Sequence, residues 1–335
     1  MLNVGVVGVA HIHMPNFAKR MKERIDVKVQ KVWDPEAKRA QKYADDLSAF
    51  AVKKLDEIWN DPNISAVVIC SETKLHQDLV LAAAKAKKHM FVEKPLGFSA
   101  ADAFRMASAI EKAKVLFQTG YMMRGSPVNM FVREHIKKGS FGEVTRIRLS
   151  VCHSGSLKGW FDTDYRWMAD AKQAGCGGYG DLGTHGLDLM LWMMDRPVER
   201  VTADLGTLTG RYGKIDEFGE GLLHFKGGAI GSLAASWVDA AHPVSMLVSG
   251  TKGHAYVADG KFYFQSDTVD GADGKAPWTN LPTALPHAFE LFLDAALGKP
   301  NQPLVTVREA AVRNAVMEAL YQGAKRGAWV KPKTK

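Results

Sequence analysis

The stretch Val-Gly-Val-Val-Gly-Val-Ala-His-Ile-His, residues 4–13, runs from an apolar segment into a turn of small residues. Residues 4–9 are apolar apart from glycine, which is typical of a strand buried on both faces. Gly8 supplies a tight turn, and Ala10 is small enough for the backbone to approach a pyrophosphate. His13 stands where a third small residue normally lets a helix pack closely on the strand. The stretch therefore matches part of a dinucleotide-binding turn.

The rest of the first 120 residues alternates apolar runs with amphipathic segments. The apolar runs predict further strands over residues 27–33, 66–70 and 89–92. Helical patterns occupy residues 37–47, 75–87 and 100–114. Because strands that alternate with helices at this spacing form βαβ units, we expect a parallel sheet here.

The pattern changes after Gly120, where strands tend to follow one another across glycine turns. Apolar runs predict strands over residues 144–152, 200–208, 220–225, 229–238, 245–249 and 261–265. Successive strands joined in this way are typical of an antiparallel sheet. Helices are expected over about 181–194 and after Thr306, where Glu309 completes a capping box. We therefore predict a dinucleotide-binding domain over residues 1–120 and an α+β domain over residues 121–335.

Size and composition agree with a two-domain globular protein. The chain has 335 residues, of which 46% are hydrophobic and 24% charged. No apolar run reaches the roughly 18 residues of a membrane helix, and the chain shows no signal-peptide pattern. The three cysteines are too few for a disulfide framework, so we expect a cytoplasmic protein. The net charge is +8, but no nucleic-acid-reading motif accompanies it, so we expect neither a nucleic-acid nor a membrane partner.

Asp34 ends the second predicted strand, 26 residues after Gly8. A carboxylate at this place can hydrogen-bond both ribose hydroxyls and repels a 2′-phosphate, so it favours NAD over NADP. The alternative is that Asp34 caps the helix that follows Pro35.

Lys94 lies between Glu93 and Pro95, directly after the apolar run 89–92. Ligands of doubly wound sheets bind at the carboxyl ends of the strands, so Lys94 is expected to face the cofactor cleft. A lysine there can polarise a hydroxyl or carbonyl oxygen. The alternative is a solvated lysine at a strand end.

A glycine-rich loop, residues 175–180, precedes a helical segment that carries Asp181, His185 and Asp188. These three residues are spaced i, i+4 and i+7, which places them on one face of a helix. Most of their neighbours are apolar, and a buried stripe of polar groups is costly unless it is paired or functional. We therefore interpret this face as part of a functional site rather than as core packing.

His11 and His13 form a His-x-His pair at the end of the first strand. Such a pair also opens many metal-dependent hydrolases built on TIM barrels, in which both rings turn to one ion. That fold needs eight parallel strands, and the antiparallel second half of the chain argues against it.

Taken together, these motifs resemble the Gfo/Idh/MocA oxidoreductase family, of the glucose-fructose oxidoreductase and inositol dehydrogenase type. The resemblance covers nearly the whole chain and rests on the order and spacing of its motifs. They are residues 4–8, Asp34, residues 71–76, Phe-Val-Glu-Lys-Pro-Leu at 91–96, residues 120–124, Tyr-Arg-Trp at 165–167, the glycine-rich run that ends at His185, and residues 250–253. The chain departs from the family pattern at Ala10, His11 and His13, and it lacks the usual Pro-Asn after Ser71.

The resemblance implies an α/β fold, with an N-terminal Rossmann domain and a C-terminal α+β domain that has a large, open, mostly antiparallel sheet. It also implies a homodimer or homotetramer formed through that sheet. The implied catalytic residues are Lys94, Asp181 and His185. The implied reaction is NAD-dependent, reversible oxidation of a secondary hydroxyl on a sugar, polyol or cyclitol. His185 would accept the hydroxyl proton, Asp181 would orient the imidazole or bind a neighbouring hydroxyl, and Lys94 would stabilise the alkoxide.

The remaining site predictions concern the two ligands. Residues expected at the cofactor are Gly8, Ala10, His11, Ile12, Asp34, Ser71, Thr73, His76, Glu93 and Lys94. Residues expected at the substrate are Arg124, His153, Tyr165 and Arg166. No metal-ligand set is assigned. Three alternatives stay open: a non-catalytic NAD-binding sensor of the same fold, a metal-dependent hydrolase that uses His11 and His13, and a reductase of an imine or enone.

Overall fold

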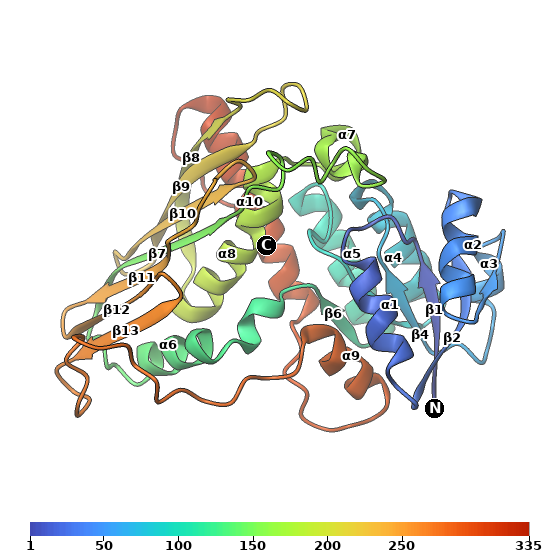
Figure 1. Ribbon diagram of the computed structural model, residues 1–335, viewed down its shortest axis with the longest axis horizontal. Coiled ribbons are helices and arrows are strands. Elements are labelled where there is room, and N and C mark those ends of the chain that lie inside the picture. The colour runs from blue at the N-terminus through green and yellow to red at the C-terminus, as the bar shows by residue number, and fades with distance from the viewer. Residues whose placement is uncertain (335) are drawn as a thin grey trace.

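The computed structural model describes residues 1–334 and contains two sheets, each with helices packed against it (Figure 1). The first sheet has the strand order β3-β2-β1-β4-β5-β6, and all its neighbouring pairs are parallel. Its strands are β1 (Leu2–Val7), β2 (Val27–Trp33), β3 (Phe50–Ala51), β4 (Ala66–Ile69), β5 (His89–Val92) and β6 (Phe117–Thr119). This order is that of the Rossmann fold, so the predicted doubly wound sheet is confirmed.

Helices cover both faces of the first sheet. They are α1 (Met14–Lys22), α2 (Ala37–Asp46), α3 (Asp56–Trp59), α4 (His76–Lys85) and α5 (Ala100–Ala113). Separate apolar clusters fill the two faces, one around Phe17 of α1 and the other around Met106 of α5. The central strands are buried on both sides, which explains why their sequences are continuously apolar. A (β/α)₈ barrel is not the fold of this chain.

The second sheet has the strand order β13-β12-β11-β7-β10-β9-β8. Only the β7–β10 pair is parallel. Its strands are β7 (Val144–Cys152), β8 (Val198–Gly206), β9 (Phe218–Phe225), β10 (Ile230–Ser236), β11 (Val244–Gly250), β12 (Gly253–Ala258) and β13 (Lys261–Ser266). Helices α6 (Pro127–Lys137) and α8 (Gly178–Met194) lie on the side that faces the first domain (Figure 1). The large, mostly antiparallel sheet is therefore confirmed.

Several elements differ from the sequence predictions. Strands β3, β6 and β12 and helices α1, α3, α6, α7 (Ala171–Ala174) and α9 (Ala288–Ala296) were not predicted. β3 has only two residues, and both of its side chains are exposed, so it has no apolar pattern. Helix α8 begins three residues earlier than expected, at Gly178. A helix that starts with glycines is stabilised by its packing rather than by propensity, which the sequence pattern does not reveal.

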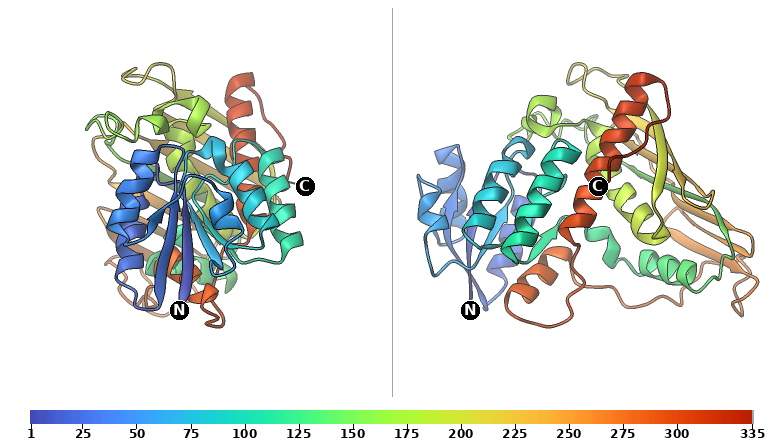
Figure 2. Two further views of the ribbon diagram at one scale, coloured as in Figure 1. Left: turned by 90° about the vertical axis from the view of Figure 1, so that its right-hand side faces the viewer. Right: turned by 180° about the vertical axis from the view of Figure 1, so that it is seen from behind.

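The chain returns to the first domain after the second sheet is complete. Phe289, Phe292 and Leu293 of α9 pack in the cluster around Phe17. Helix α10 (Val307–Arg326) runs between α5 and β8 and so contacts both domains (Figure 2). Its N-terminus has the predicted capping box of Thr306 and Glu309. No helix within residues 1–334 combines the length and apolar character needed to span a bilayer.

Candidate active site

The site lies where the carboxyl ends of β1, β4 and β5 meet the N-terminal turns of α8. Lys94, directly after β5, places its Nζ 2.5 Å from Oδ1 of Asp181 in the first turn of α8. The Lys94 residue is only 3% exposed. The first domain therefore supplies the cation and the second domain the anion of this pair.

Lys94 and Asp181 each favour the charged form of the other. Burial alone would lower the pKa of Lys94, but the charges of Asp181 and Glu93 outweigh it and raise that pKa above its ordinary value. Burial would likewise raise the pKa of Asp181, but Lys94 and a hydrogen bond from Trp237 hold it well below its usual range. Both groups are therefore charged at neutral pH, and Lys94 can donate hydrogen bonds but cannot act as a base.

Trp237 was not predicted as a site residue. It follows β10 and is fully buried, and its indole Nε1 donates to Asp181 Oδ2 over 3.0 Å. The second carboxylate oxygen is thereby held while the first contacts Lys94. A buried tryptophan needs a partner for its N–H, and that requirement is the only signal in the sequence that points to it.

His185 lies one turn further along α8 and is half-buried. Its Nδ1 is buried without a hydrogen-bond partner among the described residues. Burial, assisted by the charge of Lys94, lowers the pKa of His185 from 6.5 to about 3, so the ring is a neutral imidazole. The carboxylate oxygens of Asp181 contact Lys94 and Trp237 instead. The predicted role of Asp181, to orient the His185 ring or to bind a neighbouring hydroxyl, stays a prediction, and its carboxylate is held by Lys94 and Trp237.

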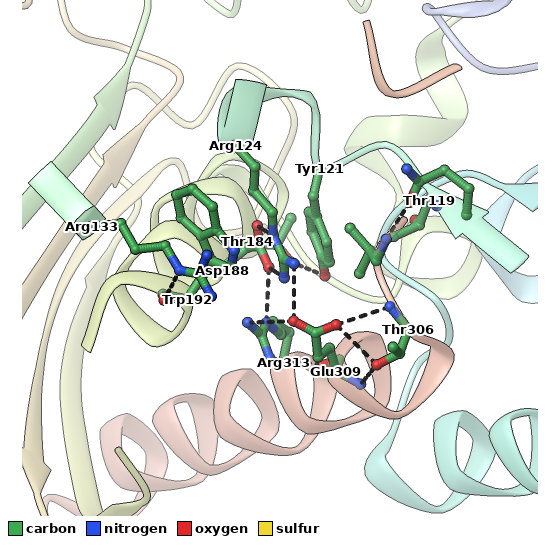
Figure 3. A network of polar contacts seen from close by, with 12 residues as sticks. Thr119, Tyr121, Arg124, Arg133, Thr184, Asp188, Trp192, Thr306, Glu309 and Arg313 are labelled. Atoms are coloured by element: carbon green, nitrogen blue, oxygen red, sulfur yellow. Dashed lines mark hydrogen bonds and ion pairs between the residues drawn. The ribbon is translucent and has the colours of Figure 1, made fainter. Parts of the chain in front are cut away.

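Asp188 shares the helix face of His185 but belongs to a different network (Figure 3). It accepts hydrogen bonds from Arg124 (Nε, 2.8 Å; Nη2, 2.5 Å) and from Nε of Arg313 (2.9 Å). Arg124 also donates to Glu309 over 2.9 Å. The guanidinium of Arg124 is thus occupied by carboxylates, and its role at the substrate stays a prediction. Asp188 instead joins α8 to α10 and to the segment after β6.

The glycine turn fits a cofactor phosphate at its first position. Gly8 has a positive φ of 81°, and a Cβ there would lie 2.4 Å from the Cβ of Ser71. The helix that follows, α1, has no acidic residue in its first turn, and its first amides donate to the carbonyls of His11 and His13. Ala10 is buried, and its carbonyl accepts a hydrogen bond from Trp167 Nε1. Ile12 is half-buried and packs against the core of the second domain.

Asp34 is held in place before any ribose could bind. Its carboxylate accepts hydrogen bonds from the amides of Val9 (2.8 Å) and Glu36 (2.8 Å) and from Nε of Arg39 (2.9 Å). Arg39 also donates to Glu72 over 2.8 Å. Burial raises the pKa of Asp34 above its ordinary value, against the effect of these donors. Two carboxylates, those of Asp34 and Glu72, therefore face the guanidinium of Arg39 at the end of β2.

The residues after β4 form the wall beneath this turn. Ser71 and Thr73 are buried, and the Ser71 hydroxyl donates to the carbonyl of Glu72. His76 Nδ1 donates to the carbonyls of Pro95 (3.1 Å) and Leu96 (3.3 Å). His76 therefore supports the loop that carries Lys94, which is a positioning role.

His11 and His13 converge on Glu93. Nδ1 of His13 lies 2.9 Å from Oε1 of Glu93, although the two residues are 80 positions apart in sequence. The rings of His11 and His13 meet edge to face, with centroids 4.6 Å apart. One donor atom from each of these three residues lies within 4.8 Å of the others. Burial lowers the pKa of His11 to about 3.

The other predicted substrate residues differ in position. His153 is half-buried, and its ring packs on Trp160 with centroids 4.8 Å apart. Tyr165 is partly buried beside the core of the second domain. Arg166 is largely exposed, lies 3.7 Å from Asp162 and covers the ring of Tyr212. His153 and Tyr165 remain candidate substrate-binding residues. The guanidinium of Arg166 instead contacts Asp162 and the ring of Tyr212 at the surface.

Comparisons with known proteins agree with this architecture. Residues 2–121 match an oxidoreductase family with an NAD-binding Rossmann fold, and residues 130–256 match the GFO/IDH/MocA C-terminal domain. Two solved structures share the fold over nearly the whole chain. Aldose-aldose oxidoreductase from Caulobacter crescentus has a TM-score of 0.82 at 21% identity, covering 98% of this chain and 99% of that one. Levoglucosan dehydrogenase in complex with NADH and levoglucosan has a TM-score of 0.81 at 19% identity, covering 99% of both chains.

Curated relatives are similar in sequence as well. Myo-inositol 2-dehydrogenase of Thermotoga maritima is 30% identical over 235 residues, which cover 69% of this chain and 67% of that protein. 2,7-Anhydro-N-acetylneuraminate hydratase of Escherichia coli is 30% identical over 262 residues, which cover 76% of this chain and 66% of that protein. The resemblance detected in the motifs is therefore confirmed, and the chain is an oxidoreductase that belongs to the Gfo/Idh/MocA family.

Proposed function

We propose that this protein oxidises a secondary hydroxyl of a sugar, polyol or cyclitol with NAD, and reduces the corresponding ketone. The observation that carries the proposal is the buried Lys94–Asp181 pair at the cofactor edge of the first sheet, with the neutral ring of His185 one helical turn away. A bound nicotinamide cofactor would supply the acceptor or donor of the hydride. The protein supplies position, charge and a proton acceptor.

Each catalytic side chain has a distinct task in this mechanism. Burial favours the neutral ring of His185, and its Nδ1 has no hydrogen-bond partner among the described residues, so this ring is the group we assign to accept the hydroxyl proton. Lys94 is charged and donates to the substrate oxygen as negative charge develops there. Asp181 keeps Lys94 charged and directed, and Trp237 holds Asp181 in turn. Asp181 and Trp237 therefore act as positioning residues.

The substrate class rests on the similar proteins. Their names include an inositol dehydrogenase, a levoglucosan dehydrogenase and a 1,5-anhydro-D-fructose reductase. All three act on hydroxyl-rich rings or their ketones. The test is to follow NADH absorbance with a panel of inositols, aldoses, anhydrosugars and polyols. Turnover on at least one member supports the proposal, whereas NAD binding without turnover on any favours the sensor alternative.

We propose NAD rather than NADP as the cofactor, because Asp34 and Glu72 surround Arg39 at the ribose position. Thermal melting should show a larger stabilisation by NAD than by NADP; a ligand at about 100 times its Kd adds roughly 2.7 kcal/mol. Asp34→Ala should raise the Kd of NAD about 10- to 100-fold, because a hydrogen bond to a charged group is lost. The same variant should bind NADP more tightly, since Arg39 is released toward the 2′-phosphate.

The control for this prediction is the double variant Asp34→Ala/Arg39→Ala, which should lose the gained affinity for NADP while still binding NAD weakly. Equal melting shifts with both cofactors in the unmodified protein would contradict the assignment of Asp34 to the ribose.

We further propose that copies of the chain associate through the open face of the second sheet. We also propose that the protein works in the cytoplasm. Apolar side chains are exposed on the sheet at Leu222, Ile230 and Val244. Such groups favour a contact between copies. The cytoplasmic proposal is supported by three free cysteines, at positions 70, 152 and 176.

A further inference from the structure

His11 and His13, at which the chain departs from the usual glycine turn, lie close together in the fold. His11 lies in the loop after β1, and His13 immediately precedes α1. Glu93 reaches the same point from the end of β5, two strands away in the sheet. The fold therefore collects two imidazoles and one carboxylate from distant parts of the chain.

We propose that His11, His13 and Glu93 bind one divalent transition-metal ion of the zinc class. Their donor atoms already lie within 4.8 Å of one another. Ligand atoms around a tetrahedral zinc ion, at bond lengths of about 2.1 Å, are separated by roughly 3.4 Å. Small side-chain rotations are therefore sufficient to close the site.

The types of donor atom indicate which metal ions this site would bind. Imidazole suits zinc, copper, iron and nickel, whereas magnesium and calcium prefer oxygen ligands only. Two neutral imidazoles and one carboxylate carry a single negative charge, which a divalent ion more than balances. Three protein ligands leave at least one coordination position for water or another oxygen, as in catalytic rather than structural zinc sites.

The carboxylate is fixed where the ion would need it. Glu93 is fully buried, and its Oε2 accepts the amide of Lys94 over 2.9 Å. Gly120 leaves room for it, because a Cβ at that position would lie 2.9 Å from Oε2. Oε1 is the oxygen that faces His13. Oε2 of Glu93 is therefore held by the backbone, and Oε1 is the oxygen that would bind the ion.

The competing explanation is that His13 and Glu93 form a hydrogen-bonded pair without metal. That explanation gives no reason for His11 to lie beside the pair. Nδ1 of His11 accepts only a 3.2 Å hydrogen bond from the amide of His13, at the outer limit of normal length. Little is therefore lost when that ring turns to an ion. His11 also lines a small cavity together with Lys94 and Asp181, so the open position of the ion would be close to the proposed catalytic pair.

The experiment uses the full chain, stripped of metal with a chelator and free of NAD. Zinc is titrated by calorimetry, and cobalt by its visible absorption. We expect one ion per chain. His13→Gln should weaken binding at least about 10- to 100-fold, the loss that even outer-shell partners cause. His13 is partly exposed, so this variant should fold, which circular dichroism verifies.

The matched control is His224→Gln, which removes another histidine that lies 3.5 Å from a glutamate, Glu199, on the second sheet. This variant should bind zinc and cobalt like the unmodified protein. Unchanged affinity in His13→Gln, loss of binding in His224→Gln, or no saturable site in the unmodified chain would each overturn the proposal. All of these readouts are independent of dehydrogenase activity, so a failed substrate panel leaves the metal result intact.

Discussion

Lys94→Ala is expected to lower the kcat of substrate oxidation by about 10²- to 10³-fold, the effect of removing one donor to a developing oxyanion. Lys94 is the charged donor held at the cofactor edge, and its Nζ also lies 3.3 Å from the backbone carbonyl of Asp181. Its geometry is thus set by two contacts before substrate arrives. The Kd of NAD should change much less, because the turn around Gly8 and Asp34 is not altered. The measurements are steady-state kinetics and calorimetric titration with NAD.

The same substitution leaves Asp181 as a buried charge with only Trp237 as a partner, so the free energy of unfolding should fall by about 3–5 kcal/mol. The double variant Lys94→Met/Asp181→Asn removes both charges and should recover much of that stability without recovering turnover. Lys88→Ala is the matched control, because Lys88 is another buried lysine of the same domain, whose Nζ donates to two carbonyls. It should lose stability but keep kcat. Near-normal turnover in a folded Lys94→Ala protein would refute the role of Lys94.

Asp188→Ala is expected to destabilise the protein by about 3–5 kcal/mol, since it leaves Arg124 and Arg313 buried without their shared carboxylate. For domains of this size, that loss lowers the Tm on the order of 10 °C. The network connects the segment after β6, helix α8 and helix α10 (Figure 3), so the loss should appear as a lower free energy of unfolding of the second domain. Chemical denaturation followed by tryptophan fluorescence measures both effects.

Two comparisons make this prediction specific. Asp204→Ala, on an exposed position of β8, should change the free energy of unfolding by less than about 0.5 kcal/mol. Asp188→Asn keeps the shape and one acceptor oxygen, so its effect should fall between the two. If Asp188→Ala unfolds like Asp204→Ala, the network contributes nothing to the stability of the second domain.

Much of the fold could be predicted because its signals are local. The buried strands β1, β4 and β5 are continuously apolar, and their helices begin at recognisable residues such as Ser99 and Thr306. Lys94 could be placed because a residue at the carboxyl end of a central parallel strand faces the ligand cleft. The family resemblance added the partners from the second domain, Asp181 and His185.

The roles of residues on one helix face were harder to separate. Asp181 and Asp188 share a face of α8, but seven residues correspond to a rise of about 10 Å, so the two carboxylates meet different partners. One contacts Lys94, and the other contacts Arg124 and Arg313. Periodicity reports which face a side chain lies on, but it does not report what is packed against that face.

The sequence by itself thus determined the buried strands β1, β2, β4 and β5, most of the helices that follow them and the place of Lys94 directly after β5, because these depend on residues close together in the chain. Only the tertiary structure decided which charged and polar groups meet. Trp237 reaches Asp181 across 56 positions, and Glu93 reaches His13 across 80. Such pairings depend on how two sheets and α10 pack together, and nothing in the local pattern of either partner specifies the other.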